Sequence, residues 1–163
     1  MDRQLADNLF KTYSRGMYNI SLRMLGNRQD AEDVLQDALI QAYTKLNSLK
    51  AIESFGPWLK RIVINHCIRF IQCRINFSDL TGIDQKDESE ETDLYKFSME
   101  EINQSIQQLP DGCRIVFTLY LLENYSHKEV ASMLGISEST SKSQYQRARQ
   151  LLQHQLNKKL HHG

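Results

Sequence analysis

The stretch that decides the fold is Ser126-His-Lys-Glu-Val-Ala-Ser-Met-Leu-Gly-Ile-Ser-Glu-Ser-Thr-Ser-Lys-Ser-Gln-Tyr-Gln-Arg-Ala-Arg-Gln-Leu-Leu152. Ser126 and Glu129 have the spacing of a capping box, which predicts that a helix begins there. Gly135 predicts the end of that helix, because glycine adopts a left-handed conformation with the least strain. Ser137 can then cap a second helix. The pattern predicts a helix-turn-helix, a unit that places its second helix in the DNA major groove.

The second helix of this motif is predicted to have two different faces. Apolar residues at helical spacing, Tyr145, Ala148, Leu151 and Leu152, are expected to face inward. The other face carries hydroxyl, amide and basic side chains, with no acidic residue after Glu138: Ser139, Lys142, Ser143 and Gln146, with Arg149 one turn on. An ordinary solvated basic face would look similar, but the Ala-x-x-x-Gly spacing between two capped helices favours DNA binding.

Composition is compatible with one domain or two small ones, since the chain has 163 residues of which 40% are hydrophobic. No apolar run reaches the length of a membrane span. The N-terminal sequence Met-Asp-Arg-Gln-Leu lacks the apolar region of a signal peptide, so we expect the protein in the cytoplasm. Cys67, Cys73 and Cys113 form no Cys-x-x-Cys pair, which favours reduced, mostly buried thiols over a zinc site.

Charge is distributed unevenly, although the formal net charge of the chain is zero. Residues 1–75 hold 11 Lys/Arg against 7 Asp/Glu, residues 76–98 hold 2 against 7, and residues 99–163 hold 7 against 6. Two segments, 58–74 and 139–163, are basic and contain no acidic residue. Two separate basic faces suit binding at two places on one nucleic acid.

The predicted fold class is all-α, because only two prolines and seven glycines interrupt the chain and no strand-like alternation persists. We expect two small helical domains, residues 1–75 and 99–160. Residues 76–98 are polar and acidic and contain too few apolar side chains to fold alone, so they are predicted to be a flexible linker.

Both predicted domains carry motifs of one protein family. In chain order these are Asp30-Ala-Glu-Asp-Val-Leu-Gln-Asp37, Phe55-Gly-Pro-Trp-Leu-Lys-Arg-Ile-Val-Ile-Asn65, Leu109-Pro, Arg114-Ile-Val-Phe-Thr-Leu-Tyr120, and the helix-turn-helix ending Arg147-Ala-Arg149. In this order, over nearly the whole chain, they resemble the extracytoplasmic-function (ECF) sigma factors of bacteria. The resemblance implies a helical bundle called sigma region 2 and a helix-turn-helix domain called region 4, joined by a variable linker.

The resemblance implies a protein that binds core RNA polymerase, directs it to specific promoters and assists promoter melting in transcription initiation. An acidic face in region 2 would dock a coiled coil of the largest polymerase subunit: Asp30, Glu32, Asp33, Gln36 and Asp37. Part of this charge also stabilises a helix N-terminus through the macrodipole. An anti-sigma protein that blocks such faces is a further expected partner, and no cofactor or metal is expected.

Region 2 is also expected to contact the downstream (−10) promoter element. The residues that match the family at this position are Trp58, Lys60, Arg61, Asn65 and Arg69. An amide can read a base edge, and arginine can hold a phosphate or stack on a base. Trp58 has core packing as an alternative role, and His66 is interpreted as a core histidine with a hydrogen-bond partner.

Region 4 is expected to read the upstream (−35) element. The residues assigned to it are Ser139, Thr140, Lys142, Ser143, Gln144, Gln146, Arg147 and Arg149, some on phosphates and a few on bases. Two residues depart from the common family pattern Thr-Val-Lys-Ser-Arg. Ser141 replaces an apolar residue, and Gln144 replaces an arginine. Since glutamine prefers adenine edges and arginine prefers guanine, Gln144 predicts a different upstream sequence.

Two alternative functions belong to other classes. A helix-turn-helix transcriptional regulator that binds duplex DNA without joining the polymerase would explain residues 99–160, but it leaves the Asp30–Asp37 and Pro57–Arg69 segments without a role. An enzyme is the second alternative, since His127-x-Glu129 resembles a zinc deaminase pair. No Pro-Cys-x-x-Cys sequence follows that pair, and no nucleophile–base set or phosphate loop stands out.

Overall fold

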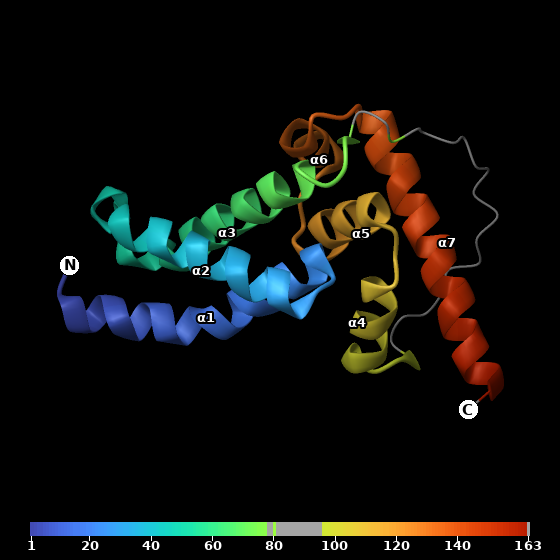
Figure 1. The fold of residues 1–163 in the computed structure, drawn as a ribbon, viewed down its shortest axis with the longest axis horizontal. Helices are drawn as coiled ribbons and strands as arrows, with labels where there is room; N and C mark the ends of the chain where they lie inside the picture. Colours follow the sequence, from blue (N-terminus) through green and yellow to red (C-terminus); the bar gives the residue numbers. More distant parts are fainter. Residues whose placement is uncertain (78–79, 81–95, 163) are drawn as a thin grey trace. The chain divides into compact units, whose positions relative to one another are not determined.

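The computed structural model describes residues 1–77, 80 and 96–162, and within these residues it contains helices and no strand (Figure 1). The all-α prediction is confirmed. The elements are α1 (Arg3–Leu25), α2 (Arg28–Thr44), the 3₁₀ turns η1 (Leu46–Ser48) and η2 (Ile52–Ser54), α3 (Phe55–Gln72), α4 (Met99–Gln107), α5 (Asp111–Phe117), the π-helical segment η5 (Thr118–Leu122), α6 (His127–Leu134) and α7 (Glu138–His162). No described helix has the length and apolar character needed to cross a membrane.

The chain divides into two compact units, Met1–Arg74 and Ile75–Gly163. We call them the N-terminal unit and the C-terminal unit. Most of the predicted linker, residues 78–79 and 81–95, lies outside the described residues.

The N-terminal unit is built from three helices that pack pairwise against one another, α1, α2 and α3. Gly26 ends α1 in a left-handed conformation with φ 69°, and the Asn27 side chain then accepts a hydrogen bond from the Asp30 amide to cap α2. Side chains from all three helices are fully or almost fully buried: Met24, Leu25, Ala31, Val34, Ala38, Phe55, Leu59, Val63, Ile64 and Ile71. The core is therefore aliphatic around one central aromatic ring, Phe55.

Helix α3 begins two residues before Pro57. Proline is tolerated in the first turn because an amide there has no carbonyl partner within the helix. Gly56 lies against the ring of Tyr13, and a Cβ atom at this position would come within 2.8 Å of Tyr13 Cε1. Glycine therefore permits the close approach of α1 and α3 at this point.

The C-terminal unit is organised around the long helix α7, which packs against α4, α5 and α6. One apolar cluster joins three of these helices: Ile102, Ile106, Leu109, Cys113, Phe117, Ala148 and Leu152. A capping box of Ser98 and Glu101 begins α4. Helix α5 begins at Asp111, just after Pro110, where Arg114 forms an ion pair with Asp111 and donates a 3.0 Å hydrogen bond to the Leu109 carbonyl. Helix α5 ends at Phe117, and the chain continues directly as the π-helical η5.

Candidate nucleic-acid and protein interfaces

The predicted helix-turn-helix is formed by α6 and α7. Ser126 and Glu129 make both hydrogen bonds of the capping box, and Gly135 ends α6 with φ 68°. At the start of α7, the Ser137 hydroxyl accepts a 3.0 Å hydrogen bond from the Thr140 amide. Each local signal in the sequence therefore has its expected structural counterpart, and α7 is held in the position of a recognition helix.

The outer face of α7 presents cations and hydroxyls to solvent. Ser139, Lys142 and Arg147 are exposed, whereas Thr140, Ser143, Gln146 and Arg149 are half-buried. Lys142 lies 3.9 Å from Glu138, and both side chains are more than half exposed, so the pair is weak and Lys142 can exchange it for a phosphate. The Arg149 guanidinium lies 5.9 Å from the centre of the Tyr145 ring.

Gln144 does not lie on this outer face. Its side chain is 4% exposed, and its Oε1 atom accepts a 3.2 Å hydrogen bond from the Cys113 thiol on α5. The assignment of Gln144 to the DNA-reading face is therefore wrong. Gln144 continues the buried series of Ala148 and Leu152 at four-residue steps, and this spacing could have revealed its position.

Ser141 also faces inward, as its place in the family's apolar position predicted. It is fully buried, and its hydroxyl oxygen lies 2.9 Å from Nδ1 of His127, the first residue of α6. The inner face of α7 thus carries two polar residues, each with a partner on another helix. Neither partner was predicted from the sequence.

A second polar face lies along α3. Arg61, Asn65 and Arg69 are exposed and recur at four-residue steps, so they share one side of the helix. Trp58 and Lys60 are half-buried, and the Trp58 ring centre is 5.8 Å from that of Phe55. Trp58 therefore packs partly on the core while keeping one part of its surface in solvent.

His66 on α3 is half-buried and forms a hydrogen bond with Gln41 of α2, in agreement with its interpretation as a core histidine. Burial lowers the pKa of His66, and the nearby Arg69 charge lowers it further. The folded N-terminal unit therefore binds a proton on His66 less tightly than the unfolded chain does.

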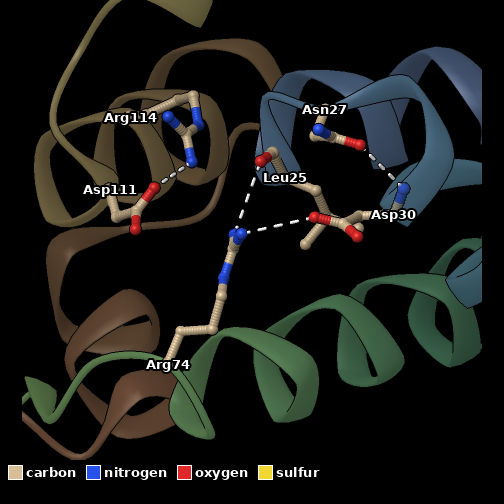
Figure 2. Close-up of polar contacts among 6 residues, drawn as sticks. All are labelled: Leu25, Asn27, Asp30, Arg74, Asp111 and Arg114. Carbon is tan, nitrogen blue, oxygen red and sulfur yellow. Dashed lines mark hydrogen bonds and ion pairs between the residues drawn. The ribbon is translucent and has the colours of Figure 1, made fainter.

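The acidic face predicted on α2 divides into two parts. Glu32, Asp33, Gln36 and Asp37 are exposed, and the ion pair of Glu32 with Arg28 on the same helix is itself exposed to solvent. Asp30 is instead held within the unit, because Arg74, two residues after the end of α3, donates a 3.3 Å hydrogen bond to its carboxylate and a 3.5 Å hydrogen bond to the Leu25 carbonyl (Figure 2). Arg74 thus joins the ends of all three helices, and Asp30 serves this contact.

An apolar groove lies beside the exposed acids, between α1 and α2. Its volume is about 770 Å³, and its lining comprises Asp7, Asn8, Phe10, Lys11, Ser14, Glu32, Leu35, Gln36, Leu39, Ile40, Tyr43 and Thr44. Ile40 is 58% exposed and Tyr43 is 49% exposed. This surface was not predicted from the sequence. Ile40, an apolar residue off the face of α2 that carries Val34, Ala38 and Ala42, was the available signal.

The cysteines are free, with Cys67 and Cys113 buried and Cys73 exposed. Burial raises the pKa of Cys67 to about 11, so its thiol stays protonated. Within residues 1–77, 80 and 96–162, no group of three or more His, Cys, Asp or Glu side chains is placed to hold a metal ion.

Comparisons with known proteins cover both units. Residues 9–74 match the family model "Sigma-70 region 2", and residues 99–152 match "Sigma-70, region 4". The RNA polymerase sigma-H factor of Pseudomonas aeruginosa is 30% identical, over 93% of this chain and 86% of its own. The ECF RNA polymerase sigma factor SigW of Bacillus subtilis is 28% identical, over 95% of this chain and 90% of its own. In fold, the chain resembles the sigma factor RpoE of Bartonella quintana, solved with the anti-sigma factor NepR (TM-score 0.59, 20% identity, covering 96% of this chain and 98% of that one).

Proposed function

Because the chain belongs to the extracytoplasmic-function family of RNA polymerase sigma factors, we propose that it binds core RNA polymerase in the cytoplasm, directs it to specific promoters and assists their melting. A sigma factor acts by binding and is not an enzyme. We assign region 2 to residues 1–75, the linker to 76–98 and region 4 to 99–160.

The observation that carries the proposal is the pair of basic polar faces on α3 and α7, one in each unit. The α3 face presents Arg61, Asn65 and Arg69 without a neighbouring acid on the same helix. The α7 face presents Lys142 and Arg147 beside exposed or half-buried hydroxyls. One helix-turn-helix alone would suit a simple regulator, but the second face on α3 suits a protein that contacts a promoter at two places.

Core polymerase is proposed to dock on the N-terminal unit at α2. The exposed acids Glu32, Asp33 and Asp37 can pair with basic side chains of a partner, and Gln36 can form hydrogen bonds. The adjacent groove between α1 and α2 adds the exposed apolar surface of Ile40 and Tyr43. Apolar surface surrounded by charges is typical of protein-binding sites. Asp30 is assigned a structural role instead, because it forms the ion pair with Arg74.

The downstream element is proposed to contact α3. Arg61 and Arg69 would hold the backbone of the melted strand, and Asn65 between them would read a base edge. Lys60 is assigned to phosphates. Half-buried Trp58 has an exposed part that can stack on a base, while its other part packs against Phe55.

The upstream element is proposed to contact α7 through the outer-face residues. Lys142, Arg147 and Arg149 would neutralise phosphates, and Ser139, Thr140, Ser143 and Gln146 would position the helix or contact bases. Gln144 has no part in this contact.

The decisive experiment is transcription with purified core polymerase on a pooled genomic DNA library. We expect discrete transcripts that require this protein and that share two spaced upstream elements. The double variant Asp33→Lys/Asp37→Lys should lose core binding while it still binds duplex DNA through region 4. Lys142→Ala/Arg147→Ala should show the opposite pattern. Tight duplex binding without any polymerase binding would instead establish the plain regulator.

An anti-sigma protein is proposed as a second partner. The support is the exposed groove between α1 and α2, which is apolar enough to bind an amphipathic segment of another protein, and which lies on the same face as the proposed polymerase contact. An inhibitor covering this groove would therefore compete with core polymerase. Tyr43→Glu should weaken binding to both partners, and loss of only one would separate the two surfaces.

A further inference from the structure

His127 is placed where three elements of the C-terminal unit meet. Its ring stacks on Tyr120 of η5, with ring centres 3.9 Å apart and planes inclined by 12°. It also meets the edge of Tyr145 on α7, with a centre distance of 5.7 Å. Because His127 is the first residue of α6, these contacts fix the start of that helix against both η5 and α7.

A hydrogen bond connects the same ring to the inner face of the recognition helix. Nδ1 of His127 lies 2.9 Å from the hydroxyl oxygen of Ser141, which is fully buried. A hydrogen bond is directional, so it constrains the rotation and position of α7 relative to α6 more narrowly than an apolar contact does. In the first turns of α7, Ser141 lies between Thr140 and Lys142, two residues assigned to the outer face.

We propose that His127 and Ser141 are a matched pair of positioning residues that sets the orientation of α7 against α6, and thereby the fit of its outer face to the upstream promoter element. The pair acts through helix geometry and does not itself contact DNA. The inference rests on the proposed function, because it assumes that the outer face of α7 binds this element.

The arrangement supports a pair rather than two independent residues. A buried serine hydroxyl without a partner would be destabilising, so Ser141 depends on His127. Burial lowers the pKa of His127, Lys142 lowers it further and Glu138 raises it, so the net shift disfavours the charged ring. Tyr120 and Tyr145 are the other titratable groups that face the ring. A neutral imidazole can form this hydrogen bond as donor or acceptor.

The test compares Ser141→Thr with Ser141→Val in the full-length protein. Threonine and valine have the same shape and differ only in that threonine has a hydroxyl where valine has a methyl group. The loss of stability caused by the added volume is therefore the same in both variants. The readout is transcription by the reconstituted holoenzyme from promoters randomised in the upstream element, at a temperature where circular dichroism shows every variant folded. We expect Ser141→Thr to keep the wild-type sequence preference and Ser141→Val to lose about tenfold in use of the preferred element.

His127→Phe provides the same test from the other residue. Phenylalanine keeps a ring that can stack on Tyr120 but removes the ring nitrogens, so the Thr/Val difference at position 141 should disappear in this background. If Ser141→Thr and Ser141→Val showed equal promoter preference in the protein that retains His127, the proposed pair would be overturned. A difference between the two variants that persists in the His127→Phe background would overturn it as well. If transcription by the wild-type holoenzyme did not depend on an upstream element at all, the proposed function of α7 would be refuted. This result differs from the two outcomes that would refute only the His127–Ser141 pair.

Discussion

At the scale of single residues, the structure separates side chains that stabilise the fold from those available to partners. Asp30 and Asp37 are both acids of α2 within one motif, yet Asp30 is held by Arg74 whereas Asp37 is exposed. Gln144 and Arg147 are similarly close on α7, yet Gln144 is buried and Arg147 is exposed. Residue type alone does not distinguish these roles, and each pair permits a controlled comparison.

Replacing Arg74 by alanine should destabilise the N-terminal unit. The variant loses both the ion pair with Asp30 and the hydrogen bond to the Leu25 carbonyl, which together join three helix ends. Because the pair is partly exposed, we expect a loss of roughly 1 kcal/mol. Thermal unfolding followed by circular dichroism checks this, with exposed Arg61→Ala as the matched arginine control. An unchanged melting temperature would show that the contact contributes nothing.

Replacing Gln144 by alanine should lower stability and leave the promoter sequence preference unchanged. The change removes the hydrogen bond from Cys113 and leaves a small void, at a cost of about 1–2 kcal/mol. Arg147→Ala is the control, since it should weaken DNA binding with little effect on unfolding. Promoter selection with holoenzymes that contain each variant compares their sequence preferences. An altered base preference of Gln144→Ala would show that Gln144 does contact DNA bases.

At the scale of elements, each unit contains one histidine that connects two helices. His66 joins α3 to Gln41 of α2, and His127 joins α6 to Ser141 of α7. Burial is the main cause that lowers the pKa of each ring. A histidine whose pKa is lower in the folded state than in the unfolded state makes stability depend on pH.

Acidification should therefore destabilise both units. Between the lowered pKa of each folded histidine and the unfolded value near 6.5, the unfolded chain binds more protons than the folded chain, so the free energy of unfolding should fall as pH decreases through this range. Lys45 and Arg69 oppose the charged form of His66, and Asp37 favours it. Urea unfolding at several pH values checks this, with His66→Gln and His127→Gln expected to flatten the dependence. A free energy of unfolding that stays constant or rises in acid would contradict the expectation.

At the scale of the whole molecule, a chain of zero net charge is proposed to bind a polyanion. The uneven distribution of charge makes such binding possible, because the basic segments 58–74 and 139–163 contain no acidic residue. Electrostatic attraction to DNA depends on the local field of a face more than on total charge. The exposed cations of α3 and α7 are therefore expected to determine how DNA binding responds to salt.

Removing two cations from α7 should weaken the salt dependence of duplex binding by a predictable amount. Each phosphate contact on duplex DNA contributes about 0.9 to the slope of log affinity against log salt concentration, so Lys142→Gln/Arg147→Gln should reduce that slope by about 1.8. Binding of the holoenzyme to an upstream-element duplex at several salt concentrations measures it. Arg61→Gln/Arg69→Gln should leave this slope unchanged. If both double variants reduced the slope equally, the assignment of upstream-element binding to α7 alone would be refuted.

The sequence by itself determined the helical class, the helix-turn-helix and the family, since these depend on signals close together in the chain. Capping boxes, a left-handed glycine and apolar residues at helical spacing act within a few residues, and α6 and α7 formed where they predicted. The three exposed polar residues of α3 were assigned from the family resemblance, and their four-residue spacing places them on one side of the helix.

Only the tertiary structure decided which polar residues have internal partners. Arg74 and Asp30 are 44 positions apart, Cys113 and Gln144 are 31 apart, and His127 and Ser141 are 14 apart. Whether such groups meet depends on the angles at which helices pack, and no local pattern encodes those angles. For the same reason the groove between α1 and α2 was not foreseen, because exposure of Ile40 and Tyr43 depends on how far α1 extends over α2.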